Sequence, residues 1–77
     1  MKVIGKVKEF DGYNGYIKGL DGKEYLLTEK EIVKPTKLEI DDNVIFEPEY
    51  YKTIETEENI ARFIRKIEKR SEYLFFM

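Results

Sequence analysis

Lysines and aromatic residues are interleaved near the beginning of this chain, within residues 6–18. A lysine can neutralise a phosphate of a nucleic acid, and an exposed aromatic ring can stack on one of its bases. If this stretch forms the outer face of a small sheet, the two kinds of side chain lie side by side. The pattern predicts weak binding of single-stranded RNA or DNA by these residues: Lys6, Lys8, Phe10, Tyr13, Tyr16 and Lys18.

Catalytic residue types are scarce in this sequence. It has no histidine and no cysteine, which removes the commonest general base, the thiolate nucleophile and most zinc ligands. Its one serine, Ser71, stands in a run of charged residues. The acidic residues do not have the spacing of a calcium-binding loop. We therefore expect no enzymatic activity, no metal site and no cofactor.

The net charge of −2 is unevenly distributed along the chain. Residues 38–58 contain eight acidic side chains and one lysine, whereas residues 1–37 contain eight lysines and six acidic side chains. A weakly acidic total argues against strong nonspecific binding to nucleic acid. A local basic surface is still compatible with it, because salt screens charges that lie far apart. Any nucleic-acid binding should therefore be weak and dependent on salt.

The composition is that of a folded, single-domain chain. Of its 77 residues, 42% are hydrophobic and 14% are aromatic, which is too apolar for a disordered segment. No apolar run has the length of a membrane-spanning helix, and the first residues do not resemble a signal peptide. We therefore expect a cytoplasmic protein without a membrane contact.

Three strands are predicted within the first 28 residues. Residues 2–10 alternate between apolar and polar side chains, and residues 16–20 and 24–28 follow after glycine-containing turns. The first turn contains Asn14-Gly15, a strong hairpin signal, so both of its glycines are expected in the turn. Connections this short predict an antiparallel meander. A fourth strand is expected at residues 44–46, with Tyr50-Tyr51 in the long loop that follows.

The residues of the last third are compatible with two structures. Four apolar residues recur at helical spacing (Ile60, Phe63, Ile64 and Ile67), and they favour an amphipathic helix over residues 57–70. The competing interpretation is a fifth strand that closes a barrel. Periodicity alone leaves this choice open.

The chain resembles the cold-shock domain family in its glycines and apolar residues. Gly5-Lys6-Val7-Lys8 with Phe10 resembles the opening G-K-V-K-W-F of that family, and Gly15-Tyr16-Ile17 resembles the second half of its K-G-F-G-F-I motif. Three residues near the end resemble the closing A-x-x-V-x-x-I pattern: Ala61, Ile64 and Ile67. The resemblance implies an all-β, five-stranded antiparallel OB-type barrel over residues 1–67. It also implies that this barrel binds single-stranded nucleic acid.

The chain departs from the family at the positions of the stacking aromatic residues. Glu9 stands where the tryptophan is expected, and three other residues stand where phenylalanines are expected: Asn14, Leu26 and Glu29. These replacements favour an alternative function, in which the protein kept the barrel, lost the nucleic acid and became a protein-interaction module.

The chain ends in a strongly apolar segment. Residues 68–77 include Tyr73, Leu74, Phe75 and Phe76, which would promote aggregation if they were left exposed. We expect this tail to dock on its own barrel. A contact with a partner protein, or self-association, is the alternative.

Overall fold

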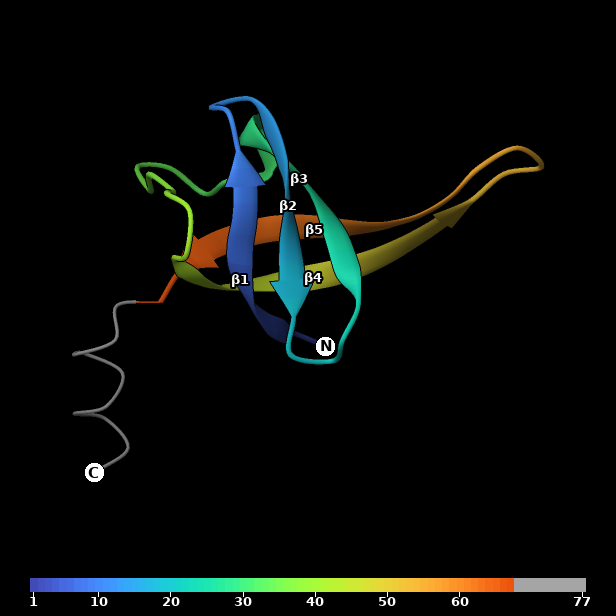
Figure 1. Ribbon diagram of the computed structural model, residues 1–77, viewed down its shortest axis with the longest axis horizontal. Coiled ribbons are helices and arrows are strands. Elements are labelled where there is room, and N and C mark those ends of the chain that lie inside the picture. Colours follow the sequence, from blue (N-terminus) through green and yellow to red (C-terminus); the bar gives the residue numbers. More distant parts are fainter. Residues whose placement is uncertain (68–77) are drawn as a thin grey trace.

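The computed structural model describes residues 1–67, which form a closed five-stranded β-barrel (Figure 1). The strands follow one another around the barrel in the order β1-β2-β3-β5-β4. Their bounds are β1 Val3–Phe10, β2 Asn14–Gly19, β3 Glu24–Thr28, β4 Asn43–Lys52 and β5 Glu57–Lys66. All neighbours pair antiparallel except β3 and β5, which pair parallel. The predicted all-β barrel of OB type is confirmed.

Helical structure is almost absent from residues 1–67. The short 3-10 helix η1, Glu29–Glu31, follows β3 directly. None of the described residues belongs to a helix with the length and apolar character needed to cross a membrane. The alternative of a long helix over residues 57–70 is therefore wrong for residues 57–66, which form β5.

The core consists of side chains that alternate inward along each strand. Tyr25 packs its ring edge-on against Phe46, with ring centroids 4.8 Å apart. The other buried members are Val7, Ile17, Leu27, Ile32, Leu38, Val44, Ala61 and Ile64. Every strand contributes at least one of these residues, so the barrel has a single continuous core.

A β-bulge explains why β5 has helical spacing in its sequence. The register between β4 and β5 shifts between the pairs Glu47–Arg62 and Ile45–Arg65. Phe63 is the extra residue, with a left-handed φ of 52° and an exposed side chain. Because the bulge inserts one residue, Ala61 and Ile64 both point into the core although they are three positions apart.

The residues that form the first turn differ from those predicted. Asn14 and Gly15 belong to β2, and Gly12, with φ of 102°, carries the positive φ of the turn. Gly15 is required for another reason. A Cβ atom there would lie 1.8 Å from the backbone oxygen of Glu9. The glycine therefore allows β1 and β2 to approach each other closely beside a bulge in β1.

The distal halves of β4 and β5 form a two-stranded arm, residues 50–59, that extends beyond the barrel (Figure 1). Tyr50 and Tyr51 lie in β4 within this arm, so the prediction that they belong to a long loop is wrong. The connection is the turn at residues 53–56, where the Thr53 N–H donates to the Thr56 carbonyl at 2.7 Å. Most of the residues expected in a long loop belong instead to the two strands.

The prediction that the tail docks on the barrel falls on residues 68–77, which lie outside the described residues. The same is true of the proposed contacts of Tyr73, Leu74, Phe75 and Phe76.

Candidate binding groove

A groove of about 760 Å³ opens on the outside of the barrel. It is lined by the end of β1, the first turn, parts of β2 and β3, and the beginning of β5. Ile40, from the connection between β3 and β4, lies at its border. Ligands of OB folds bind on this side, over strands 2 and 3 between the β1–β2 and β4–β5 loops. The groove therefore lies on the face where OB folds bind their ligands.

A row of cross-strand neighbours runs along the groove. Tyr16 is opposite Glu9 on β1 and opposite Leu26 on β3. Leu26 in turn pairs with Ile60 on β5. Tyr16 and Ile60 are half-buried, and the side chain of Leu26 is 37% exposed. Tyr16 and Leu26, which line the groove, therefore form an apolar strip that a ligand could cover.

Carboxylates surround this apolar strip. Five acidic residues line the groove: Glu9, Asp11, Glu24, Glu57 and Glu58. Among the described residues, no lysine or arginine lines it. Every ionisable side chain that borders this cavity, apart from the two tyrosines, is therefore an acid.

Asp11 is held in its ionised form by the first turn. Its carboxylate accepts hydrogen bonds from the backbone N–H groups of Asn14 and Tyr13, each at 2.8 Å. The bond from Asn14, followed by the bond from Tyr13, holds the pKa of Asp11 below its ordinary value. The negative charge at this end of the groove thus persists to lower pH than that of a free aspartate.

The groove continues into a gap between β3 and β5. These two strands share one residue pair, Leu26 with Ile60, and a further bridge joins Ile32 to Ile64 beyond η1. Ahead of Leu26 the two strands are not paired. Glu24 and Tyr25 on one side and the segment 57–59 on the other side line the cavity. The barrel is therefore closed at one end of this seam and open at the other.

The residues predicted from the sequence are divided between two places. Phe10 and Tyr16 line the groove, and Phe10 also packs against the core. Tyr13, which is 72% exposed, lies in the first turn and does not line the groove. None of the three predicted lysines lines it.

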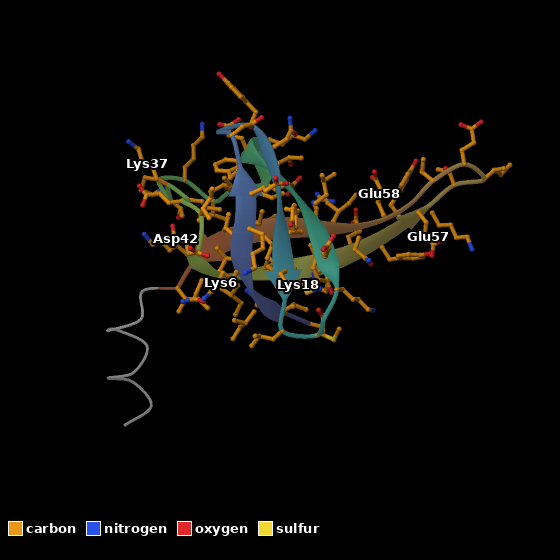
Figure 2. The ribbon with its side chains drawn as sticks, viewed as in Figure 1. Lys6, Lys18, Lys37, Asp42, Glu57 and Glu58 are labelled. Carbon is orange, nitrogen blue, oxygen red and sulfur yellow. The ribbon has the colours of Figure 1, made fainter. Side chains whose placement is uncertain are left out.

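Lys6 and Lys18 form a basic pair beside the groove. Lys6 and Lys18 are opposite each other on β1 and β2, and both are exposed. They lie on the barrel itself, whereas Glu57 and Glu58 lie in the arm, directly after its turn (Figure 2). Lys8 falls at the bulge of β1, outside the regular pairing. Lys18 lies opposite Glu24, a residue of the groove, and two positions along β2 from Tyr16, so the lysine pair borders the groove without lining it.

The acidic lining was missed because the acids come from distant parts of the sequence. Glu57 and Glu58 belong to a segment that is typical of a solvated surface, and Glu24 is one of many charged residues near a turn. The signal that could have located them is the parallel contact of strands 3 and 5 in an OB barrel. That contact brings the beginning of strand 5 beside the beginning of strand 3.

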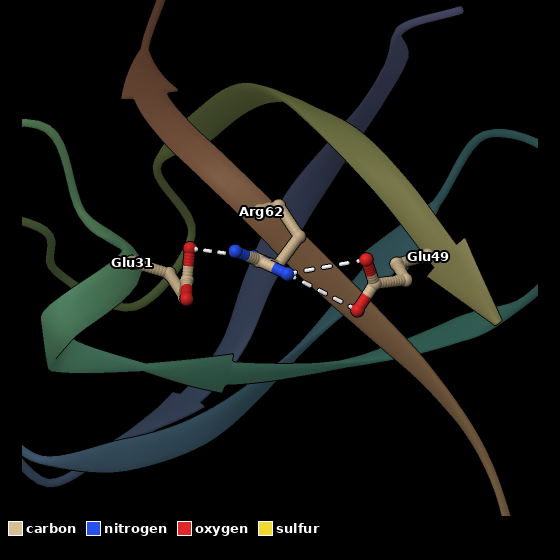
Figure 3. A network of polar contacts seen from close by, with 3 residues as sticks. All are labelled: Glu31, Glu49 and Arg62. Atoms are coloured by element: carbon tan, nitrogen blue, oxygen red, sulfur yellow. Dashed lines mark hydrogen bonds and ion pairs between the residues drawn. The ribbon is translucent and has the colours of Figure 1, made fainter. Parts of the chain in front are cut away.

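Arg62 stabilises the closed end of the seam (Figure 3). Its Nε atom lies 2.9 Å from Glu31 in η1, and its Nη1 atom lies 3.1 Å from Glu49 in β4. Hydrogen bonding to Glu31, more than to Glu49, raises the pKa of Arg62 above its ordinary value. Because its charge is already paired with two carboxylates, Arg62 does not offset the acidity of the groove.

Comparison with known proteins does not assign this barrel to a family. No protein-family model matches the chain, and no curated protein matches it significantly.

Proposed function

We propose that the protein is an interaction module whose groove binds a basic segment of a partner polypeptide. The observation that carries this proposal is the lining of the groove, where five carboxylates surround an apolar strip. The position of the groove, on the ligand-binding side of an OB-type barrel, supports the presence of a ligand there, and the acidic lining supports a basic one.

The charge of the lining favours a basic ligand over a phosphate. A phosphate placed in the groove would lie among several carboxylates, at distances where physiological salt, with a Debye length of about 8 Å, screens incompletely. A lysine or arginine side chain would be attracted there instead. Apolar side chains of the same segment could cover Tyr16 and Leu26. Full burial of one such side chain of the segment contributes about 1.5–3 kcal/mol. A segment with both kinds of residue fits this surface.

A titration with two peptides tests the proposal. The backbone amides of the protein would be followed by NMR while a peptide of alternating lysine and valine is added. We expect shifts at Tyr16, Leu26 and Asn59, and no shifts with a peptide of alternating glutamate and valine. The proposal is wrong if the basic peptide moves none of these amides while a single-stranded oligonucleotide does.

A charge substitution tests the role of the acids directly. Replacing Glu57 and Glu58 together with glutamine would remove the two ion pairs that these residues are proposed to form with the peptide. Such pairs contribute about 0.2–1 kcal/mol each, so the affinity for the basic peptide should fall about two- to thirtyfold. The matched control is Glu55→Gln in the arm turn, outside the groove, which should leave the affinity unchanged.

Weak nucleic-acid binding is the second candidate, and the lysine pair favours it. Like charges at opposite positions destabilise a sheet, and a phosphate between Lys6 and Lys18 would relieve that repulsion. Glu24, opposite Lys18 on β3, already offsets part of it. If two phosphates are neutralised, the logarithm of affinity should fall with the logarithm of salt at a slope of about −1.4. Lys18→Ala should halve that slope, and Lys23→Ala in the second turn should not.

A further inference from the structure

The unpaired part of the seam between β3 and β5 borders the groove. We infer that the basic partner segment binds by strand addition, entering this gap and pairing with the edge of β5 at residues 57–59. This inference rests on the proposed function of the groove and specifies its binding mode.

The hydrogen bonds of β3 show which of its groups face the gap. The Gly19 N–H donates to the Lys23 carbonyl at 2.8 Å, and the Glu29 N–H donates to the Tyr13 carbonyl at 2.9 Å. In an antiparallel pair, such bonded positions alternate along the strand. The backbone groups of Tyr25 and Leu27 therefore face β2, and those of Glu24 and Leu26 face β5.

The same alternation applies to β5. The bond from the Thr53 N–H to the Thr56 carbonyl, with the register of β4 and β5, makes Glu58 and Ile60 the residues that bond to β4. The backbone groups of Glu57 and Asn59 consequently point toward β3. Parallel pairing of β3 with β5 is limited to Leu26 with Ile60, so the N–H groups of Glu57 and Asn59 lie beyond the paired part of the seam.

The two outer edges of the arm differ in a way that favours the side of β5. On β4, Pro48 lacks an N–H, and it stands where that strand leaves the barrel. Proline at this position prevents a continuous ladder on the β4 edge. The β5 edge contains no proline and borders the groove, so it can serve as the template for an added strand.

Charge complementarity identifies the added strand as a basic one. Alternate side chains of an extended segment point to opposite sides. Glu24 and Leu26, two positions apart on β3, share the outer face of the sheet. In the gap, the outward set would therefore pass both the apolar strip at Tyr16 and Leu26 and the carboxylates of Glu24 and Glu58. Lysines in this set would pair with the carboxylates and cover the strip with their aliphatic stems. Strand addition of this kind obtains affinity from main-chain bonds and specificity from alternate side chains.

Amide hydrogen exchange on the full chain tests this binding mode, with the alternating lysine–valine peptide as the probe. Exchange at Glu57 and Asn59 should slow about tenfold or more on binding, because their N–H groups gain partners. Glu58 and Ile60, already bonded to β4, are internal controls and should change little. Binding without added protection at Glu57 and Asn59 would overturn strand addition while leaving the proposed function intact. Absence of peptide binding would overturn both.

Backbone-modified peptides provide a second measurement that does not alter the protein. Methylation of single peptide nitrogens should weaken binding about two- to twelvefold at alternate positions and have little effect between them. A uniform response along the peptide would contradict strand addition. If Glu57 and Asn59 are already protected without peptide, and a chain ending at Ile67 loses that protection, the occupant is the chain's own residues 68–77 and the proposed partner is wrong.

Discussion

Strand β5 is paired to different extents with its two neighbours, β4 and β3. With β4 it forms a long antiparallel ladder that runs from the core to the tip of the arm. With β3 it shares one parallel pair, followed by a separate bridge beyond η1. The ladder forms from a hairpin that is local in sequence, whereas the seam must join segments more than thirty residues apart. The difference teaches that this barrel is paired extensively in its antiparallel sheet and sparsely along its one parallel seam, which is where we propose that a ligand binds.

The largest effect is expected where the antiparallel sheet is most tightly packed. Gly15→Ala would place a Cβ atom 1.8 Å from the Glu9 carbonyl oxygen and 2.8 Å from the Phe10 Cα. Because these contacts are with backbone, β1 and β2 would have to separate. We expect a loss of about 3 kcal/mol or more in the free energy of unfolding, measured with urea.

Gly12→Ala is the control for this substitution. Gly12 has a positive φ of 102°, but no atom lies within 4 Å of a Cβ added there. The substitution should therefore lower the free energy of unfolding by only about 1 kcal/mol. Equal losses in the two variants would show that backbone conformation, and not the close approach of the strands, determines the need for glycine.

Substitutions of two adjacent leucines on β3 distinguish a role in stability from a role in binding. Leu27 is fully buried, whereas Leu26 is 37% exposed in the groove. Leu27→Ala should lower the free energy of unfolding by about 2–5 kcal/mol. Leu26→Ala should lower it by less than about 1 kcal/mol, while weakening the binding of the basic peptide. A large loss of stability from Leu26→Ala would mean that the apolar strip belongs to the core and not to a binding surface.

The end of β3 beside the open gap is secured by Tyr25. Its hydroxyl donates to the Asp21 carboxylate. Burial, with a further contribution from Asp21, raises the pKa of Tyr25 to about 12. The same hydrogen bond is the main reason that the pKa of Asp21 lies below its ordinary value.

Removing this hydroxyl should change the pH dependence of stability. A raised tyrosine pKa favours the folded state while the phenol is neutral, so its contribution is complete below about pH 10 and is lost as pH rises toward 12. Tyr25→Phe should lower the free energy of unfolding by about 1.5 kcal/mol at neutral pH. It should also reduce the decline of that free energy between pH 10 and 12. Urea titrations across this interval measure the difference. Parallel declines in wild type and variant would show that Tyr25 does not control it.

The antiparallel strands could be predicted from the sequence because alternation and turn residues are local signals. Residues 16–20 and 24–28 follow the pattern of buried and exposed positions that the structure shows. The fifth strand required the resemblance at Ala61 and Ile64, because periodicity alone also favoured a helix. The cold-shock resemblance itself stays a prediction, although the fold that it implied is confirmed.

The groove could not be predicted, because it depends on bulges and on the parallel seam. The bulge in β1 keeps Glu9 beside Tyr16 and turns Phe10 toward the core. Strict alternation along the strand would predict the opposite orientations. The approach of Glu57 and Glu58 to Glu24 depends on how far the pairing of β3 and β5 extends. Such tertiary contacts have no local sequence signal.

The smallest expected effect concerns Phe63, the bulged residue that sets the inward positions of β5. Its φ of 52° is unusual for a bulky side chain, and its ring is 56% exposed. A non-glycine residue in this conformation costs about 1–2 kcal/mol. The guanidinium carbon of Arg62, 5.7 Å from the ring centroid, offsets part of that cost, since exposed cation–π contacts contribute about 0.5–1 kcal/mol.

Phe63→Gly and Phe63→Ala separate these two contributions, because both remove the ring and only glycine relieves the backbone. The glycine variant should be more stable than the alanine variant by about 1 kcal/mol, and close to wild type. Thermal and urea unfolding of the three proteins measure this ranking. If alanine is the more stable, the bulge does not hold a strained residue, and the spacing of Ala61 and Ile64 must be maintained by the core alone.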